Sequence, residues 1–263
     1  MFDPSFTVVG AIVGFAVGAT GVGGGSLMTP ALILLYGVAP TMAVGTDLLY
    51  ASVTKGVAAT LLGRRSALNW HIVGWLAAGS VPATLLTVWI THFMIPPAAL
   101  GQLIKAVLAV AIVLTAAFML VQEPVMRRLR RHPSGGELSP VTRRILTIVA
   151  GVTVGALVSI SSVGAGVIGM VVLMLLYPRE PTVHLIGSDL VHAVLVTALA
   201  GFGHVASGTV DYWMLLALLA GSLPGVWLGT HVAAHLRDRT LKRTIATILL
   251  VVGMTTLAHA TTH

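Results

Sequence analysis

Apolar residues occur in long runs along almost the whole chain, separated by short polar or glycine-rich breaks. The runs cover residues 6–20, 26–37, 41–62, 70–93, 98–122, 145–160, 163–177, 184–206, 211–236 and 244–260. A helix needs ~20 apolar residues to cross a bilayer, within a range of about 17–25. The runs that meet this length are 41–62, 70–93, 98–122, 184–206, 211–236 and, barely, 244–260. The pattern predicts an all-α integral membrane protein.

The four remaining runs are too short to span as single helices, and they form two pairs. Within each pair, a break rich in glycine or serine separates the two runs. Irregular backbone at membrane depth is tolerated only where it is buried in protein or lines a cavity. We therefore expect 6–37 and 145–178 to be broken hairpins, either re-entrant or made of short helices.

The sequence repeats itself at an offset of 141 residues, which becomes 142 after one inserted residue. At the first offset, Gly10, Gly14 and Gly18 recur as Gly151, Gly155 and Ser159, and Val22–Gly25 recurs as Val163–Gly166. At the second offset, Gly45–Leu48 matches Gly187–Leu190, and Gly79 and Ser80 match Gly221 and Ser222. Internal duplication is typical of transporter folds. The matches predict two homologous halves, 1–122 and 145–263, joined by a basic linker at 123–144.

The distribution of Lys and Arg indicates how the halves are oriented, because these residues concentrate in cytoplasmic loops. The loops at 63–69, 123–144 and 237–243 are basic, whereas 92–97 and 207–211 carry no Lys or Arg. Equivalent loops of the two halves thus differ in charge, which favours inverted halves, each with one hairpin and three spanning helices. The alternative is about eight full spans in parallel halves. It would place 237–243 outside the cell, against the positive-inside rule.

Composition supports a membrane location and excludes several other classes of protein. Of 263 residues, 56% are hydrophobic and 9% are charged, whereas soluble domains are about 25% charged. The net charge of +7 comes mostly from clusters between apolar runs rather than from a basic face with aromatics, so nucleic acid is not an expected partner. There is no cysteine, which excludes disulfides and thiolate metal sites.

The glycine-rich breaks are the first candidate binding elements. Gly21–Pro30 fits neither a Walker A loop nor a dinucleotide fingerprint, because no lysine follows its glycines and no strand precedes it. A helix that starts near Ser26 would direct partial positive charge into a cavity. The expected anion-binding residues at the two breaks are Gly23, Gly24, Gly25, Ser26, Ser161, Ser162, Gly164 and Gly166. The alternative is tight helix packing, which we prefer for Gly10, Gly14 and Gly18.

Ionisable residues deep in a span are costly and usually functional. Lys55 lies nine residues before Arg64, about 13 Å of helix, which is too far for easy snorkelling. We expect it to bind an anion; the alternatives are a structural ion pair or partial snorkelling. Asp47 and Asp189 are equivalent, and Tyr50 and His192 follow them by one turn. A carboxylate shielded from water binds a proton readily, so these four are candidates for coupling or gating, or else for clamping the hairpins.

Metal binding and catalysis have weaker support. His231 and His235 are spaced i, i+4, which can hold a metal ion, but no third ligand lies nearby in the sequence. A divalent metal-ion permease is kept as an alternative function, and so is a permease for another small organic anion. No Ser-His-Asp arrangement is apparent, so we expect neither an enzyme nor a cofactor. Small residues at Gly221, Gly225 and Gly229 leave a homo-oligomer open.

The duplicated glycine-rich break, the segments Gly45–Leu48 and Gly187–Leu190, and the later Gly79–Pro82 resemble the TauE/SafE sulfite-exporter family over essentially the whole chain. The run Gly45–Lys55 looks like a subgroup with Asp and Lys in the first half. This resemblance implies a permease of the bacterial inner membrane that carries sulfite, an organosulfonate or another small anion without a cofactor. It also points to both glycine-rich breaks and to the segments around the two aspartates.

Overall fold

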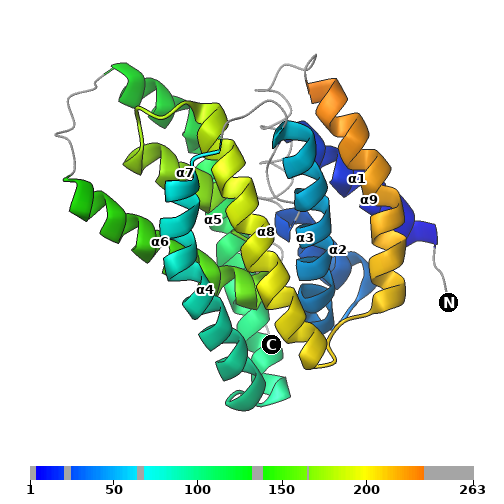
Figure 1. Cartoon of the computed structure of the whole chain (residues 1–263). Helices are drawn as coiled ribbons and strands as arrows, with labels where there is room; N and C mark the ends of the chain where they lie inside the picture. The colour runs from blue at the N-terminus through cyan, green and yellow to red at the C-terminus, as the bar shows by residue number, and fades with distance from the viewer. Residues whose placement is uncertain (1–3, 21–24, 64–67, 132–138, 165, 234–263) are drawn as a thin grey trace.

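The chain is helical throughout the part that the structure describes, as the sequence predicts. A computed structural model describes residues 4–20, 25–63, 68–131, 139–164 and 166–233 (Figure 1). The helices are α1 (Pro4–Thr20), α2 (Gly25–Tyr36), α3 (Pro40–Gly63), α4 (Trp70–Phe93), α5 (Pro97–Arg131), α6 (Pro140–Ser161), α7 (Val167–Leu176), α8 (Thr182–Ala206) and α9 (Tyr212–Ala233). Within these ranges there is no strand, so the prediction of an all-α fold is confirmed.

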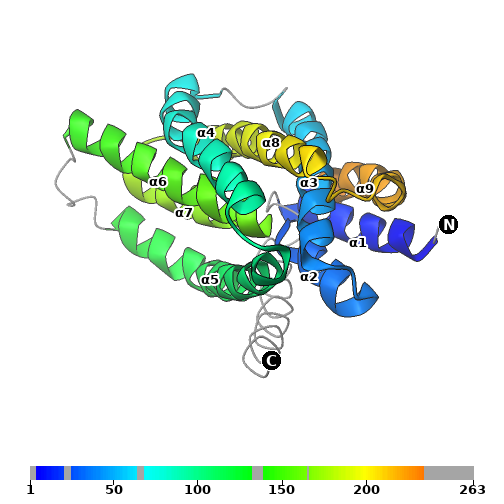
Figure 2. The same cartoon turned by 90° about the horizontal axis from the view of Figure 1, so that it is seen from below.

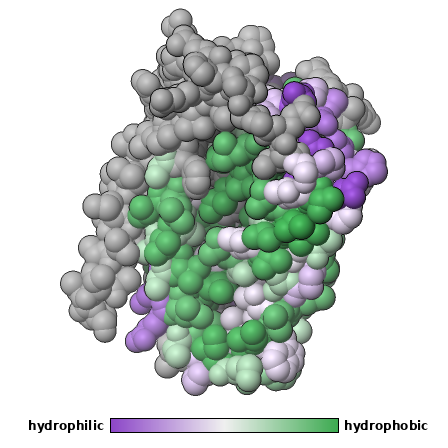
Figure 3. Space-filling model, turned by 90° about the vertical axis from the view of Figure 1, so that its left-hand side faces the viewer, coloured by the Kyte–Doolittle hydropathy of each residue, from purple (hydrophilic) through white to green (hydrophobic). Residues whose placement is uncertain are grey.

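Four helices are long and apolar enough to cross a membrane: α4, α6, α8 and residues Tyr212–Val232 of α9. They contain 21 to 25 residues, which corresponds to about 32–38 Å of helix and matches a bilayer. Large apolar side chains such as Leu86, Trp89 and Val149 are exposed on their outer faces. Figure 3 shows apolar residues over most of the described surface on one side of the molecule. These features are those of a multi-pass membrane protein.

Two other helices, α3 and α5, cover predicted spans but are less uniformly apolar. The 24 residues of α3 include the polar positions Thr46, Asp47, Thr54 and Lys55, so this helix is less apolar than the four above. The described apolar part of α5, Ala99–Thr115, falls in the run 98–122. Because α5 continues to Arg131 and α6 begins at Pro140, both helices extend into the predicted linker. The predicted basic loop 237–243 and the predicted final span 244–260 lie outside the described residues.

The second predicted break is present between α6 and α7. The first falls between α1 and α2, at residues 21–24, which lie outside the described residues. The second helix of each hairpin is short: α2 has 12 residues and α7 has 10, or about 18 and 15 Å. The expectation that both helices of the second hairpin are short is wrong, because α6 has 22 residues. The apolar run starts at residue 145 and so omits residues 140–144 of the helix, which include Arg143 and Arg144 and follow the N-cap Ser139.

The first helix of each half packs against a spanning helix of the other half. The helix α1 lies along α9, and its equivalent α6 lies along α4 (Figures 1 and 2). A Cβ atom on Gly14 would overlap the backbone of Ser222, and one on Gly155 would overlap the backbone of Ser80. These two contacts are equivalent under the repeat. Glycine therefore permits close helix approach here, as predicted for Gly14.

The helices α3 and α8 are also equivalent, and they pack against each other between the two outer pairs (Figures 1 and 2). The Leu49 side chain lies where a Cβ atom of residue 201 would be, next to Gly201, and Gly45 lies against His204. Residue numbers therefore rise along α3 as they fall along α8, so the two helices run antiparallel. Opposite directions of equivalent helices are consistent with inverted halves.

Equivalent hydrogen bonds join the halves at both ends of this central pair. The Asp211 N–H donates to Thr46 Oγ1 over 3.0 Å, and the Asn69 N–H donates to Ser188 Oγ over 3.2 Å. Both donors precede a spanning helix, and both acceptors precede one of the paired aspartates in sequence. The local geometry around Asp47 and Asp189 is thus fixed by contacts from the opposite half.

Candidate functional site

Two equivalent carboxylates lie buried beside the broken hairpins. Asp47 accepts a hydrogen bond through Oδ2 from the hydroxyl of Thr29 on α2. Asp189 lies against Gly169 of α7, so closely that a Cβ atom at that glycine would overlap Oδ1. Each carboxylate therefore contacts the short second helix of the hairpin in its own half. A change in either hairpin would alter the surroundings of its aspartate.

Lys55 lies in the centre of this region and is only 1% exposed. Its charge is within electrostatic range of Asp189 and Asp47 and of His192. Because Leu49 contacts Gly201 in an antiparallel pair, six further residues along each helix place Lys55 level with about residue 195. The lysine is thus close to the level of its own equivalent, Thr197, where the two halves meet.

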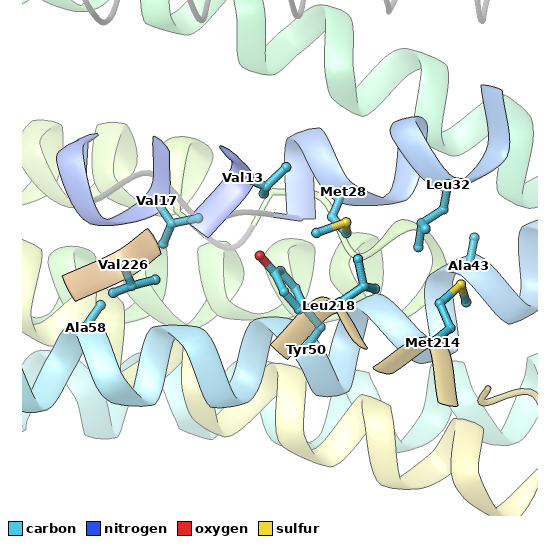
Figure 4. Close-up of a cluster of buried hydrophobic side chains, with 10 residues drawn as sticks. All are labelled: Val13, Val17, Met28, Leu32, Ala43, Tyr50, Ala58, Met214, Leu218 and Val226. Atoms are coloured by element: carbon cyan, nitrogen blue, oxygen red, sulfur yellow. The ribbon is translucent and has the colours of Figure 1, made fainter. Parts of the chain in front are cut away.

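Two more equivalent contacts extend the polar region toward the outer helix pairs. His192 Nε2 is 2.8 Å from Ser80 Oγ on α4. On the other side, the hydroxyl of Tyr50 faces that of Ser222 on α9. Figure 4 shows the Tyr50 ring among buried apolar side chains that include Met28. The polar chain therefore runs from α9 through α3 and α8 to α4.

Buried polar atoms without a hydrogen-bond partner are concentrated in this cluster. Among the described residues, six such side-chain atoms lie here. They are Asp47 Oδ1, Tyr50 Oη, Ser162 Oγ, Asp189 Oδ1, His192 Nδ1 and Ser222 Oγ. An unpaired buried polar atom costs about 1–3 kcal/mol, so folded proteins rarely collect several together. Such a concentration is expected where a polar ligand binds.

The break after α6 supplies one of these atoms through an unusual backbone conformation. Ser162 has a φ of 58°, and its N–H caps α6 by donating to the Val158 carbonyl over 2.8 Å. The left-handed region is unfavourable for serine by roughly 1–2 kcal/mol. Gly164 also has a positive φ, of 111°. The result is that the Ser162 hydroxyl lies beside the Asp47 carboxylate, next to the start of α7.

The structure brings together six of the predicted site residues: Asp47, Tyr50, Lys55, Ser162, Asp189 and His192. Gly164 and Gly166 form the second break, where Gly166 caps α7 without a side chain. The Ser161 hydroxyl instead donates to the Leu157 carbonyl in the last turn of α6 over 2.8 Å, and it accepts from the Val163 N–H in the break over 3.3 Å.

The remaining predicted residues are less well defined. Gly23 and Gly24 lie outside the described residues, as does the Ser26 side chain, while Gly25 begins α2. His231 is exposed and contacts its own helix at Trp227 O, and His235 is not described. Within the described ranges, no group of three or more His, Asp or Glu residues is arranged to hold a metal ion.

Sequence reasoning missed Thr29, Ser80, Gly169 and Ser222 as members of the cluster. Ser80 and Ser222 carried a usable signal, because both belong to the repeated Gly-Ser pair. Thr29 lies in the first glycine-rich segment, but nothing in the sequence marked its hydroxyl as the partner of Asp47. Gly169 has no signal outside the three-dimensional contact.

Comparison with known proteins assigns the chain to a family. Residues 6–256 match the family model described as "Sulfite exporter TauE/SafE". The chain belongs to the TauE/SafE family. A relative in Bacillus subtilis, named "Probable membrane transporter protein YjnA", is 37% identical over 95% of this chain and 98% of its own length.

More distant TauE/SafE relatives carry similar names. A "Probable membrane transporter protein" from Xylella fastidiosa is 25% identical over 93% of this chain and 91% of its own length. A second Bacillus subtilis relative, "Probable membrane transporter protein YdhB", is 26% identical over 92% and 95%. No solved structure matches the chain. Family and helices together identify a multi-pass membrane transporter, with a small-molecule substrate and a lipid environment.

Proposed function

We propose that this TauE/SafE protein is a secondary transporter for a small sulfur-containing anion, either sulfite or an organosulfonate. The observation that carries the proposal is that Lys55 is buried in the same polar cluster as three hydroxyl groups without a hydrogen-bond partner, those of Tyr50, Ser162 and Ser222. A sulfur oxyanion offers several acceptor oxygens and a negative charge. Lysine and hydroxyl groups supply the matching positive charge and donors. The name of the matching family, sulfite exporter, supports the same class of substrate.

In this proposal the anion lies between Lys55 and the second helix break. Ser162 would donate its hydroxyl, and the start of α7 adds the partial positive charge of a helix N-terminus. The ten-residue α7 lacks a side-chain cap, so no side chain occupies the N–H groups of its first turn. A buried ammonium repels a metal cation, which makes the divalent metal alternative less favourable.

Asp47 and Asp189 would couple transport to protons. Both are buried, each with one oxygen that has no hydrogen-bond partner, and a buried charge without full compensation tends to be neutralised by a proton. With the halves inserted in opposite directions, one aspartate would lie nearer each membrane face. The proposal also includes that the protein does not catalyse a reaction and that it lies in the bacterial inner membrane. The linker 123–144 would be on the cytoplasmic side.

Counterflow of labelled sulfite into proteoliposomes tests the proposed function. Proteoliposomes with the wild-type protein should accumulate label. Of unlabelled sulfite, taurine and sulfoacetate, the compound that reduces this uptake most is the preferred substrate. Lys55→Met should reduce uptake at least about tenfold, the equivalent of 1.4 kcal/mol, whereas Lys105→Met, at an exposed lysine on α5, should not. Normal sulfite uptake by Lys55→Met would refute the assignment of the site. Uptake of nickel in place of sulfite would favour the metal-permease alternative.

A further inference from the structure

Two arginines near the start of α6 lie over aromatic rings that belong to other helices. The helix α6 packs against α4 and α7 (Figure 1). The Cζ atom of Arg143 is 5.2 Å from the ring centroid of Tyr177, the residue that caps the end of α7. The Cζ atom of Arg144 is 5.4 Å from the ring centroid of Trp75 on α4. A guanidinium within about 6 Å of a ring centroid is attracted to the ring face, so two cations are positioned where the three helices meet.

The ring beside Arg143 is itself held in place. The Tyr177 hydroxyl is 3.0 Å from that of Thr147, a buried residue of α6, and Thr147 Oγ1 donates to the Arg143 carbonyl over 2.8 Å. A guanidinium has five N–H donors, and contact with one ring cannot occupy all of them. Among the described residues, neither Arg143 nor Arg144 forms an ion pair with a carboxylate. Both arginines therefore keep donors for an outside ligand.

The arginines lie at the end of the bundle where two basic loops enter it. Leu76 of α4 lies against Gly151 of α6, and Ser80 lies against Gly155, so α4 and α6 run parallel and begin at the same end. A basic loop precedes each of them in the sequence, and such loops are cytoplasmic. Since Arg144 is exposed, its charge is accessible at the level of the lipid headgroups.

An exposed apolar strip leads away from the arginines along α6. Ile145, Val149 and Val152 are all exposed, and their spacing of i, i+4 and i+7 places them on one face of the helix. These three residues, the α6 strip, cover about 10 Å along the helix axis. A molecule that is negatively charged at one end and apolar below it would match both the arginines and the strip.

The first half of the repeat lacks this arrangement. At the offset of 141 residues, the two arginines correspond to Phe2 and Asp3. The tyrosine that caps α7 corresponds to Tyr36, whose ring centroid is 4.6 Å from that of Phe6 rather than next to a cation. A feature that helix packing required would recur in both halves, as the paired aspartates do. The two cations therefore need another explanation.

We propose that Arg143 and Arg144 bind the phosphate of an anionic phospholipid, whose acyl chains lie along the α6 strip. Arginine pairs its N–H groups with phosphate oxygens, and basic clusters next to a spanning helix attract anionic lipids. Ser139 already accepts the Thr142 N–H over 3.1 Å, so the side chains rather than the helix end hold the phosphate. Inorganic phosphate offers the same oxygens but would leave the strip unused, which favours the lipid. The bound lipid links α4, α6 and α7.

Native mass spectrometry of the purified full-length protein in a neutral detergent tests this site. The protein is titrated with dioleoylphosphatidylglycerol, which is anionic, or with dioleoylphosphatidylcholine, which has the same chains and no net charge. Wild-type protein should bind the phosphatidylglycerol at least about tenfold more tightly, because each basic residue near anionic lipid contributes roughly fivefold in affinity. Equal affinities for the two lipids would overturn the proposal without the need for any variant.

Three variants locate the binding. Arg143→Gln with Arg144→Gln should remove the preference for phosphatidylglycerol, whereas Lys105→Gln, at an exposed lysine on α5, should retain it. Arg143→Lys with Arg144→Lys keeps both charges but loses the planar fork, so affinity should still fall at least about threefold. Unchanged preference in the glutamine variant, or wild-type affinity in the lysine variant, would overturn the site.

A competition experiment distinguishes the lipid from a free anion. Inorganic phosphate added at constant ionic strength should not displace phosphatidylglycerol from the wild-type protein, because it makes no contact with the α6 strip. Displacement by phosphate would assign the arginines to a soluble anion and contradict the lipid site. Because lipid binding is measured without any transported substrate, a failure of sulfite counterflow would leave this result unaffected.

Discussion

Removal of the buried lysine should destabilise the protein more than removal of the lysine together with its main partner. In Lys55→Met the apolar stem is largely kept, but Asp189 loses its cation inside the bundle. Breaking a buried ion pair by removing one member costs about 3–5 kcal/mol. We expect about 3 kcal/mol here, because a proton can neutralise the carboxylate that remains.

The double variant Lys55→Met with Asp189→Asn removes both charges and should recover part of that loss. For a domain of 150–250 residues, 1 kcal/mol shifts the melting temperature by roughly 2–4 °C. Lys55→Met should therefore melt about 6–12 °C below wild type, and the double variant should lose less stability than the sum of the two single variants. The coupling energy should be at least about 1 kcal/mol.

Thermal unfolding of the purified protein in one detergent, followed by intrinsic tryptophan fluorescence, measures all four members of this cycle. Lys105→Met serves as the matched control, because Lys105 is exposed on α5, and it should change the melting temperature by less than about 2 °C. Strictly additive effects of the two substitutions would show that Lys55 and Asp189 do not interact. That result would refute the reasoning on which the site is built.

Three further predictions concern the contacts around the cluster. Gly79→Ala should destabilise the protein by about 1–3 kcal/mol, because the new Cβ would overlap the backbone of α6. Gly74→Ala on the same helix meets open space and should be neutral or stabilising by up to ~1 kcal/mol. Thermal unfolding distinguishes the two variants. Thr29→Val should cost about 1–3 kcal/mol in the same assay, because Asp47 loses its buried donor, and a neutral effect would contradict the hydrogen bond. Ser80→Ala should lower sulfite counterflow several-fold by removing the partner of the imidazole on α8, and unchanged flux would exclude a role for that contact.

Much of the candidate site was predictable because duplication and burial leave strong signals in the sequence. Asp47 and Asp189 are marked by the repeat, and Lys55 is marked by its place in the middle of an apolar run. A charge at membrane depth is costly enough to be rare without a role. The breaks at Gly21–Pro30 and Ser161–Gly166 follow equally from backbone physics.

The contacts within the site were not predictable, because they depend on how distant helices pack. The partner of His192 is Ser80, 112 positions away, and no local pattern joins them. Ser161 and Ser162 are chemically alike, and only the left-handed backbone at Ser162 decides which hydroxyl lies beside Asp47. The start of α6 was misplaced for a similar reason: a capped polar first turn, rather than an apolar one, begins the helix.

The most direct test of the central claim is to locate a bound anion. A structure of the protein with 2-bromoethanesulfonate, determined with data collected at the bromine absorption edge, would identify the position of the ligand. The account predicts a bromine peak in the centre of the bundle, with sulfonate density in contact with Lys55 and Ser162. A bromine peak on another surface, with no density beside the Lys55 ammonium, would contradict it.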